Sequence, residues 1–154
     1  MNRRLTRIAG FTLIEMVCVM AILGLIVAIL LPRIPHETTP ARLQAYGVQL
    51  ATLLKQDRNA AIRRRTEVST AVDAAARSVR SGATGQSLQL PADVVFSALL
   101  PEHCAGRRAF STISFFASGM SCGGVLALAR EGNRIEIHIN WLTGGIELVP
   151  GQAT

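Results

Sequence analysis

One acidic residue stands where a carboxylate needs a chemical partner. Glu15 is the only charged residue in the run Phe11–Leu31, whose 21 residues are otherwise almost wholly apolar. An ionised carboxylate deep in a bilayer costs about 2.5–3.5 kcal/mol, so such a residue usually has a partner. Cleavage after Gly10 would create an α-amino group on Phe11, about one helical turn from Glu15. That amine could pair with Glu15 within a chain or between chains. The alternative is a carboxylate close enough to the membrane edge to reach water.

The other chemically capable residues do not form a catalytic or metal-binding pattern. The three histidines, His36, His103 and His138, lack metal-ligand spacing, and we expect His138 to face solvent. The glycines are not followed by the Lys of a phosphate-binding loop. The sequence therefore predicts a protein that is not an enzyme and that binds no metal or cofactor.

The element that positions Glu15 is predicted to be a transmembrane helix. At 1.5 Å per residue, Phe11–Leu31 spans about 31 Å, enough to cross a hydrocarbon core of about 30 Å. Arg3, Arg4 and Arg7 precede the run without an acidic residue, so the positive-inside rule predicts a cytoplasmic N-terminus and an exported remainder. No small-x-small cleavage site follows the run, and we therefore expect the anchor to be retained.

The residues Gly10-Phe-Thr-Leu-Ile-Glu15, between a short basic leader and an apolar helix, resemble the prepilin signature of type IV pilins and type II secretion pseudopilins. The resemblance implies that a prepilin peptidase removes the leader 1–10, cutting between Gly10 and Phe11, and methylates the new N-terminal Phe11. It also implies that Glu15 aligns each new subunit with its neighbour during assembly. The implied location is the bacterial inner membrane, crossed once by residues 11–31, with a periplasmic pilin-like domain over 41–154.

The exported part is predicted to begin with a joint and a helix. Residues 32–40 hold several prolines and are predicted to form a loosened joint. Apolar residues then recur every three or four positions, which predicts an amphipathic helix over 41–65 that packs on a sheet. Its apolar stripe comprises Leu43, Tyr46, Leu50, Leu53 or Leu54, and Ala60 or Ala61. Arg63–Arg65 are predicted to be a solvated helix end, although they could also bind phosphates.

The remainder, residues 67–149, is predicted to be β-rich. Ile135, Ile137, Ile139 and Trp141 alternate with polar residues over 134–141, the pattern of a half-buried antiparallel strand. Other strands are predicted over 67–73, 90–100, 111–117 and 125–130, and a closing strand around Ile146 and Leu148. Residues 74–89 are predicted to be a mobile connection and 101–108 a loop. The predicted fold class is α+β, a pilin-like fold with a long N-terminal helix on an antiparallel sheet.

The C-terminal part resembles the H-type minor pseudopilin of type II secretion systems. The resemblance rests on Phe115-Phe116, on Ser118–Gly124 and on Trp141–Gly144. That family commonly has Pro-Asp where Ala117-Ser118 stand, so this turn must be built differently. The implied role is to link the tip of a periplasmic pseudopilus to its shaft, in a filament thought to push folded proteins across the outer membrane. The implied partners are the major pseudopilin, other minor pseudopilins, the prepilin peptidase, the inner-membrane assembly platform and the lipid bilayer.

A minor type IV pilin that acts in pilus initiation or DNA uptake is the alternative. DNA binding would need a basic strip with aromatic residues on an exposed loop or tail. The tail Leu148–Thr154 has no Lys or Arg, and only 5% of residues are aromatic, so nucleic acid is an unlikely partner. The loop residues Arg77, Arg80, Arg107 and Arg108 keep this alternative open. The formal charge of +6 supports it little, because removing three leader arginines leaves 13 basic and 10 acidic residues, or +3.

The three cysteines divide between the anchor and the exported domain. Cys18 is interpreted as a small apolar residue of the membrane helix. Cys104 and Cys122 would meet an oxidising compartment, where thiols tend to pair. We expect a Cys104–Cys122 disulfide that fixes the Ser/Gly-rich turn and contributes about 3 kcal/mol. Two free thiols are the alternative.

Overall fold

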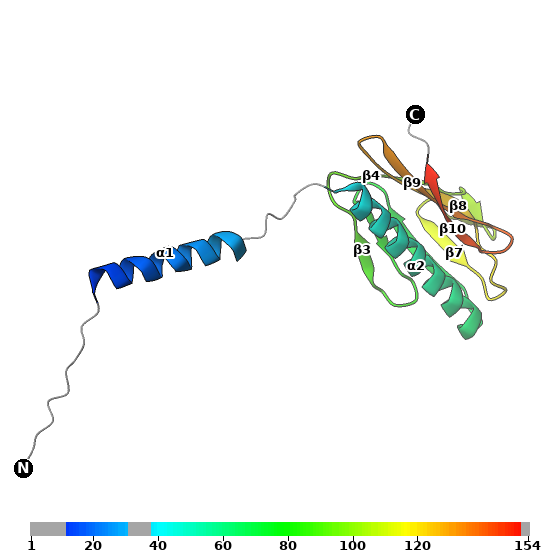
Figure 1. Cartoon of the computed structure of the whole chain (residues 1–154). Helices are drawn as coiled ribbons and strands as arrows, with labels where there is room; N and C mark the ends of the chain where they lie inside the picture. The colour runs from blue at the N-terminus through cyan, green and yellow to red at the C-terminus, as the bar shows by residue number, and fades with distance from the viewer. Residues whose placement is uncertain (1–11, 31–37, 152–154) are drawn as a thin grey trace, which may run out of the picture. The chain divides into compact units, whose positions relative to one another are not determined.

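The computed structural model describes residues 12–30 and 38–151. The chain divides into two compact units, residues 1–36 and 37–154, and each is described by itself (Figure 1). The predicted cleavage site at Gly10 and Phe11, the joint over 32–37 and His36 lie outside the described residues.

The first unit contains one helix, α1 (Leu13–Leu30). It begins after Thr12, whose hydroxyl accepts a hydrogen bond from the Glu15 N–H at 3.3 Å. The pattern Thr-x-x-Glu is that of a capping box, and Glu15 in the first turn favourably meets the positive end of the helix dipole. Apolar side chains from Leu13 to Ile26 are exposed around the helix. Within residues 12–30 and 38–151, no helix combines the length and apolarity needed to cross a membrane.

The second unit is built around helix α2 (Pro40–Arg64), close to the 41–65 that the apolar spacing predicts. Thr39 caps its start by accepting the Arg42 N–H at 3.3 Å, and Pro40 suits the first turn because its missing N–H has no helical partner there. Arg65 ends the helix in a left-handed conformation, with φ of 52°. Arg63 and Arg64 therefore lie in the last turn, where cations interact favourably with the exposed carbonyls.

Two four-stranded antiparallel sheets and a small hairpin complete this unit, where the sequence predicts one sheet. The first sheet has the order β3-β2-β1-β7, with β1 (Val68–Asp73), β2 (Ser78–Arg80), β3 (Ser87–Gln89) and β7 (Thr112–Phe115). The second has the order β10-β9-β8-β4, with β4 (Val95–Leu99), β8 (Gly124–Arg130), β9 (Asn133–Ile139) and β10 (Ile146–Gly151). The hairpin consists of β5 (His103–Cys104) and β6 (Arg107–Arg108).

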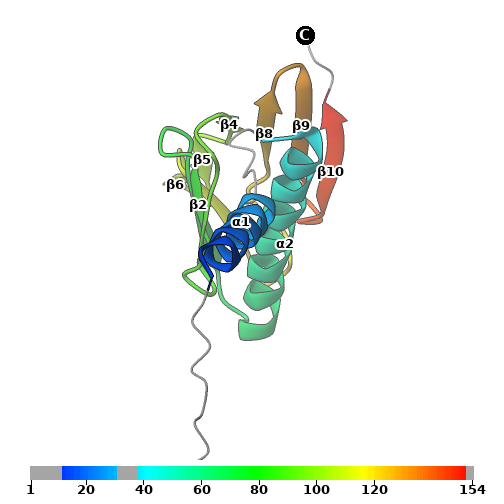
Figure 2. The same ribbon diagram turned by 60° about the vertical axis from the view of Figure 1, so that its left-hand side comes forward.

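The core lies between α2 and both sheets. Leu43, Leu50 and Leu54 on α2 are buried, as the stripe predicts, and the sheets contribute Ile113, Phe115, Leu126, Leu128 and Ile137. Helix α2 contacts β1 and β7 of the first sheet and β8, β9 and β10 of the second. In Figure 2, β2 of the first sheet lies to the left of α2, and β10 of the second sheet lies to its right. Each fully buried Leu or Phe side chain contributes about 1.5–3 kcal/mol to folding. Because the buried face of α2 packs against both sheets, the helix joins them into one core.

Three predictions about the β-rich part are wrong. Residues 74–89 are not a mobile connection, because β2 and β3 form there and pair with each other. Residues 101–108 contain the β5–β6 hairpin, whose turn residues Ala105 and Gly106 both have positive φ. Trp141 does not share the buried face of β9. The strand ends at Ile139, and the Trp141 side chain is 62% exposed.

Candidate functional site: the N-terminal motif and a disulfide-braced surface

Of the N-terminal motif Gly10–Glu15, the structure describes residues 12–15. Glu15 is exposed, and the hydrogen bond of its N–H to Thr12 fixes the first turn of α1. Its carboxylate therefore projects from the start of an apolar helix, where it can meet a cation of the same or another chain. Pairing with the amine of Phe11 remains a prediction, since that residue lies outside the described ranges.

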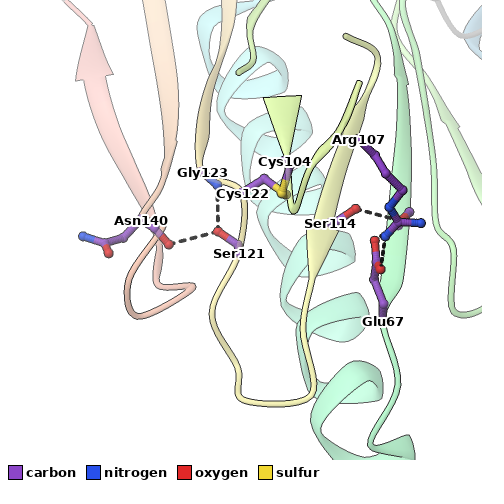
Figure 3. Close-up of a disulfide and its surroundings, with 9 residues drawn as sticks. Glu67, Cys104, Arg107, Ser114, Ser121, Cys122, Gly123 and Asn140 are labelled. Carbon is purple, nitrogen blue, oxygen red and sulfur yellow. Dashed lines mark hydrogen bonds and ion pairs between the residues drawn. A yellow bond between two sulfur atoms is a disulfide. The ribbon is translucent and has the colours of Figure 1, made fainter. Parts of the chain in front are cut away.

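The second unit contains a disulfide between Cys104 and Cys122 (Figure 3). Their Cα atoms are 5.6 Å apart, within the usual range for such a bond. Cys104 belongs to β5, and Cys122 lies just before β8. The bond therefore joins the β5–β6 hairpin to the second sheet. Among the described cysteines, Cys18 on α1 is the one that remains a free thiol.

The same hairpin has an ionic attachment to the first sheet. Arg107 on β6 pairs with Glu67, the residue before β1 (Figure 3). Hydrogen bonding with the Ser114 hydroxyl lowers the pKa of Glu67, opposed in part by burial and reinforced by Arg107 and Ser69. The hairpin thus bridges the sheets, held covalently on one side and electrostatically on the other.

Arg58 on α2 stabilises the Ser/Gly-rich turn after β7, in which Ala117-Ser118 stand in place of Pro-Asp. Its Nε donates to the carbonyl oxygen of Gly119 at 3.1 Å, and a terminal nitrogen donates to that of Thr143 at 2.9 Å. One guanidinium therefore holds the β7–β8 and β9–β10 loops together. Gly144 has a positive φ, and a Cβ there would overlap the Gly119 carbonyl, so the two loops approach more closely than any other residue type would allow.

Ser121 lies in a Gly-x-Ser-x-Gly spacing, Gly119–Gly123, which is also the pattern of a hydrolase nucleophile elbow. Here the serine lies between two strands, whereas the elbow joins a strand to a helix. Its hydroxyl donates to the carbonyl of Asn140 and accepts the Gly123 N–H, each at 3.0 Å (Figure 3). Its N–H donates to the carbonyl of Trp141, also at 3.0 Å. Ser121 is buried and ties the end of β9 to the approach to β8.

A hollow of about 650 Å³ opens beside this junction. Its lining includes Leu99 at the end of β4 and Pro101 after it, Gly123 just before β8 and Gly124 at its start, Trp141, and Glu147 on β10. None of these residues was predicted from the sequence to form a binding site. Within the part of the chain that the structure describes, no group of three His, Cys, Asp or Glu residues could hold a metal ion.

Comparisons with known proteins agree with this geometry. Residues 5–31 match the family described as the prokaryotic N-terminal methylation motif. The chain resembles the type IV minor pilin FimU of Pseudomonas aeruginosa, with a TM-score of 0.55 and 16% identity, over 71% of this chain and 90% of that chain. It equally resembles the minor pseudopilin EpsH from the type 2 secretion system of Vibrio cholerae, with a TM-score of 0.55 and 12% identity, over 70% of this chain and 95% of that chain.

The chain has a pilin-like fold, and its residues 5–31 match the N-terminal methylation motif. A second structure of EpsH gives a TM-score of 0.53 at 13% identity, over 70% of this chain and 94% of that chain. No curated protein matches the sequence. At these identities the structural likeness establishes the pilin-like fold, and it does not separate pilin from pseudopilin.

Two polar clusters of the pilin-like domain were missed by the sequence analysis. Asp57 is fully buried on α2 and accepts hydrogen bonds from Thr70, Ser81, Gly82 and Ala83. The available signal was its position on the apolar stripe, three residues after Leu54 and three before Ala60. Its donors could not be foreseen, because they come from β1 and from the β2–β3 segment that was predicted to be mobile.

The second cluster fixes the beginning of the domain. The N–H and hydroxyl of Thr38 donate to the two carboxylate oxygens of Asp93, at 2.7 and 2.9 Å. Arg130 donates to the Thr38 carbonyl, and its Nε lies 3.3 Å from Asp93 Oδ2. The Thr38 N–H lowers the pKa of Asp93, opposed in part by burial and reinforced by the Thr38 hydroxyl and Arg130. This clamp attaches the residue before the α2 cap to the second sheet.

Proposed function

We propose that this chain is a minor pseudopilin of a type II secretion system that links the tip of a periplasmic pseudopilus to its shaft. The observation that carries the proposal is the order of its parts. The methylation motif over 5–31 includes helix α1 with its exposed apolar side chains, and a separate pilin-like domain follows. The filament would drive export of folded proteins across the outer membrane.

In this role, Gly10 and Phe11 flank the bond cut by a prepilin peptidase, and Phe11 becomes the methylated N-terminus. Residues 11–31 anchor the chain in the inner membrane before assembly and pack against other subunits afterwards. Glu15 meets the N-terminal amine of a neighbour. The partners are the major pseudopilin, other minor pseudopilins and the inner-membrane assembly platform, and the domain lies in the periplasm.

A minor type IV pilin is the second candidate, favoured by a likeness to FimU whose TM-score equals that to EpsH. A DNA-uptake role receives less support. Arg107 pairs with Glu67 and Arg77 is half-buried, so these two of the four loop arginines are less accessible to a phosphate backbone. Nucleic acid therefore remains an unlikely partner.

Deleting the gene in the bacterium that encodes it separates the two candidates. A pseudopilin predicts loss of exoprotein from the culture supernatant and its accumulation in the periplasm, with twitching motility unchanged. A minor pilin predicts loss of motility or surface pili with normal secretion. Complementation by the wild-type gene is the control. A gel shift of residues 37–154 with duplex DNA at low and physiological salt tests the uptake role.

A further inference from the structure

The hollow beside Trp141 is lined by two glycines and by both apolar and polar side chains. Gly123 and Gly124 form the floor, and both have positive φ, at 73° and 145°. A Cβ on Gly123 would lie 3.1 Å from the Trp141 Cβ, and one on Gly124 would lie 2.8 Å from Leu100 Cδ2. Side chains at these positions would fill the space between the walls. The glycine pair therefore keeps the hollow open.

Backbone hydrogen bonds and the disulfide hold the hollow in shape. Ser121 bonds to the backbone of Asn140 and Trp141, and the Cys104–Cys122 disulfide fixes the residue before the glycines. The walls nevertheless present apolar surface to solvent, because Leu99 is 75% and Trp141 62% exposed. A preformed concave surface of this kind loses little conformational entropy when it binds a partner.

The charge of the hollow selects the chemistry of its occupant. Glu147 on β10 is exposed and lines the hollow, and none of the lining residues is Lys or Arg. His138, which faces Glu147 across the β9–β10 pair, also lines the hollow, and its Nε2 lies 2.8 Å from Glu136 Oε2. Among residues 12–30 and 38–151, Glu147 has no ion-pair partner, whereas the nearby Glu136 pairs with Arg134 and His138. A carboxylate and an indole that line one hollow can both attract a guanidinium or ammonium group.

We propose that this hollow receives an arginine or lysine side chain, flanked by apolar residues, from a neighbouring pilin-like subunit. The cation meets Glu147 and the face of Trp141, and the flanking apolar groups cover Leu99 and Pro101. The identity of the partner rests on the proposed function, since assembly supplies the neighbouring subunit. The binding chemistry does not rest on it, and the two are tested separately.

Binding chemistry can be followed through Trp141, because it is the single tryptophan of the chain. The full chain in detergent micelles is titrated with acetyl-Leu-Arg-Leu-amide while tryptophan emission is recorded. We expect a saturable change, with acetyl-Leu-Gln-Leu-amide binding at least about threefold more weakly, since an exposed ion pair contributes up to about 1 kcal/mol. Equal affinity for the two peptides, or no saturable change, would overturn the proposal.

Glu147 variants show whether the charge acts through the hollow. Glu147→Gln should weaken the Arg peptide about three- to fivefold. Glu131→Gln is the control, because it removes one negative charge at the opposite end of the second sheet. It should leave the affinity for the Arg peptide unchanged. Glu147→Lys should abolish binding of the Arg peptide and should allow binding of acetyl-Leu-Glu-Leu-amide. If Glu147→Gln binds like wild type, or if Glu131→Gln weakens binding as much, the assignment of Glu147 is wrong.

The partner is tested in cells with a photo-cross-linking residue at Leu142, which is exposed next to Trp141. Mass spectrometry of the cross-linked product should identify another pilin-like subunit, and Glu147→Lys should reduce its yield. Cross-linking to an exported protein, to a second copy of this chain alone, or to nothing would overturn the assignment of the partner. None of these results bears on the deletion phenotype, which alone tests the proposed function.

Discussion

The carboxylate of Asp57 on α2 accepts a hydrogen bond from the hydroxyl of Thr70 on β1, with 2.6 Å between Oδ2 and Oγ1. Both residues are fully buried. The same carboxylate accepts the Gly82 and Ala83 N–H groups at 3.0 and 3.1 Å and the Ser81 hydroxyl. A buried charge with a complete set of donors fixes one arrangement of the groups around it. Asp57 therefore positions the β2–β3 loop against the core.

Asp57→Ala should destabilise the pilin-like domain by about 3 kcal/mol or more. The substitution leaves two buried or half-buried N–H groups and two hydroxyls without their acceptor, and such groups cost about 1–3 kcal/mol each. Urea unfolding of residues 37–154, the unit that contains the whole core, measures the effect. Asp73→Asn is the matched control, because its exposed carboxylate accepts one N–H, from Ala76, and should cost under about 1 kcal/mol. A loss at Asp57 no larger than at Asp73 would contradict this account.

The clamp at Thr38 should make the start of α2 sensitive to acid. The pKa of Asp93 is lowered in the folded state, so its contribution to stability is complete above the ordinary range of an aspartate. The contribution is lost as the pH falls below about 4 and through the folded-state pKa. The protection factor of the Leu43 N–H, which bonds to the Thr39 carbonyl at 2.9 Å, should fall over that range, as measured by hydrogen exchange corrected for its intrinsic pH dependence. In Asp93→Asn the protection factor should already be lower at neutral pH and should lose most of this acid dependence.

Sequence periodicity predicts those parts of the fold in which one side of an element is buried. Leu43, Leu50 and Leu54 gave the buried face of α2, and the alternation of Ile137 and Ile139 gave that of β9. Trp141 continued the alternation on paper but lies beyond the end of the strand. Its backbone carbonyl instead accepts the Ser121 N–H, a contact between residues 20 apart that no local pattern encodes.

The parts that were missed depend on partners distant in sequence. Strands β2 and β3 hold only three residues each, amid Ser and Gly. They are fixed because β2 pairs with β1, β3 pairs with β2, and Asp57 binds the loop between them. Arg58 could be read only as a polar residue of an amphipathic helix, although it joins two loops through carbonyls at 119 and 143. Carbonyl acceptors have no signature in sequence. The hollow beside Trp141 was missed for the same reason, because four separate segments form it.

The processing prediction concerns the bond between Gly10 and Phe11. Gly10→Leu should leave uncut precursor in the inner membrane, because a bulky side chain would replace the compact residue that precedes the cleaved bond. Intact-mass measurement of the wild-type chain from membranes should show the loss of residues 1–10 and the addition of one methyl group. A wild-type chain that keeps residues 1–10 in assembled filaments would contradict the prediction.

Glu15→Ala should insert into the membrane more favourably and yet assemble poorly. Removing a carboxylate lowers the cost of burial in lipid, while the partner amine of a neighbour loses its counter-ion. Co-purification with the major pseudopilin and exoprotein secretion measure assembly, and membrane fractionation measures insertion. Glu15→Gln is the matched variant, since it keeps the side-chain volume and lacks the charge. Normal co-purification and secretion of both variants would show that Glu15 has no role in assembly.

The disulfide should be present in the mature chain and should stabilise the domain by about 3 kcal/mol, the value for a loop of this length. The chain has three cysteines, and Cys18 is free. Labelling of the unfolded, unreduced chain should therefore detect one thiol, and labelling after reduction should detect three.

The double variant Cys104→Ser, Cys122→Ser should unfold at lower urea but still fold, because Arg107 keeps the hairpin attached to Glu67. Adding Arg107→Ala should then lower the free energy of unfolding more in the double variant than in the disulfide-bonded chain. In the double variant the hairpin loses its ionic attachment as well as its covalent one. Three thiols before reduction would show that the bond does not form.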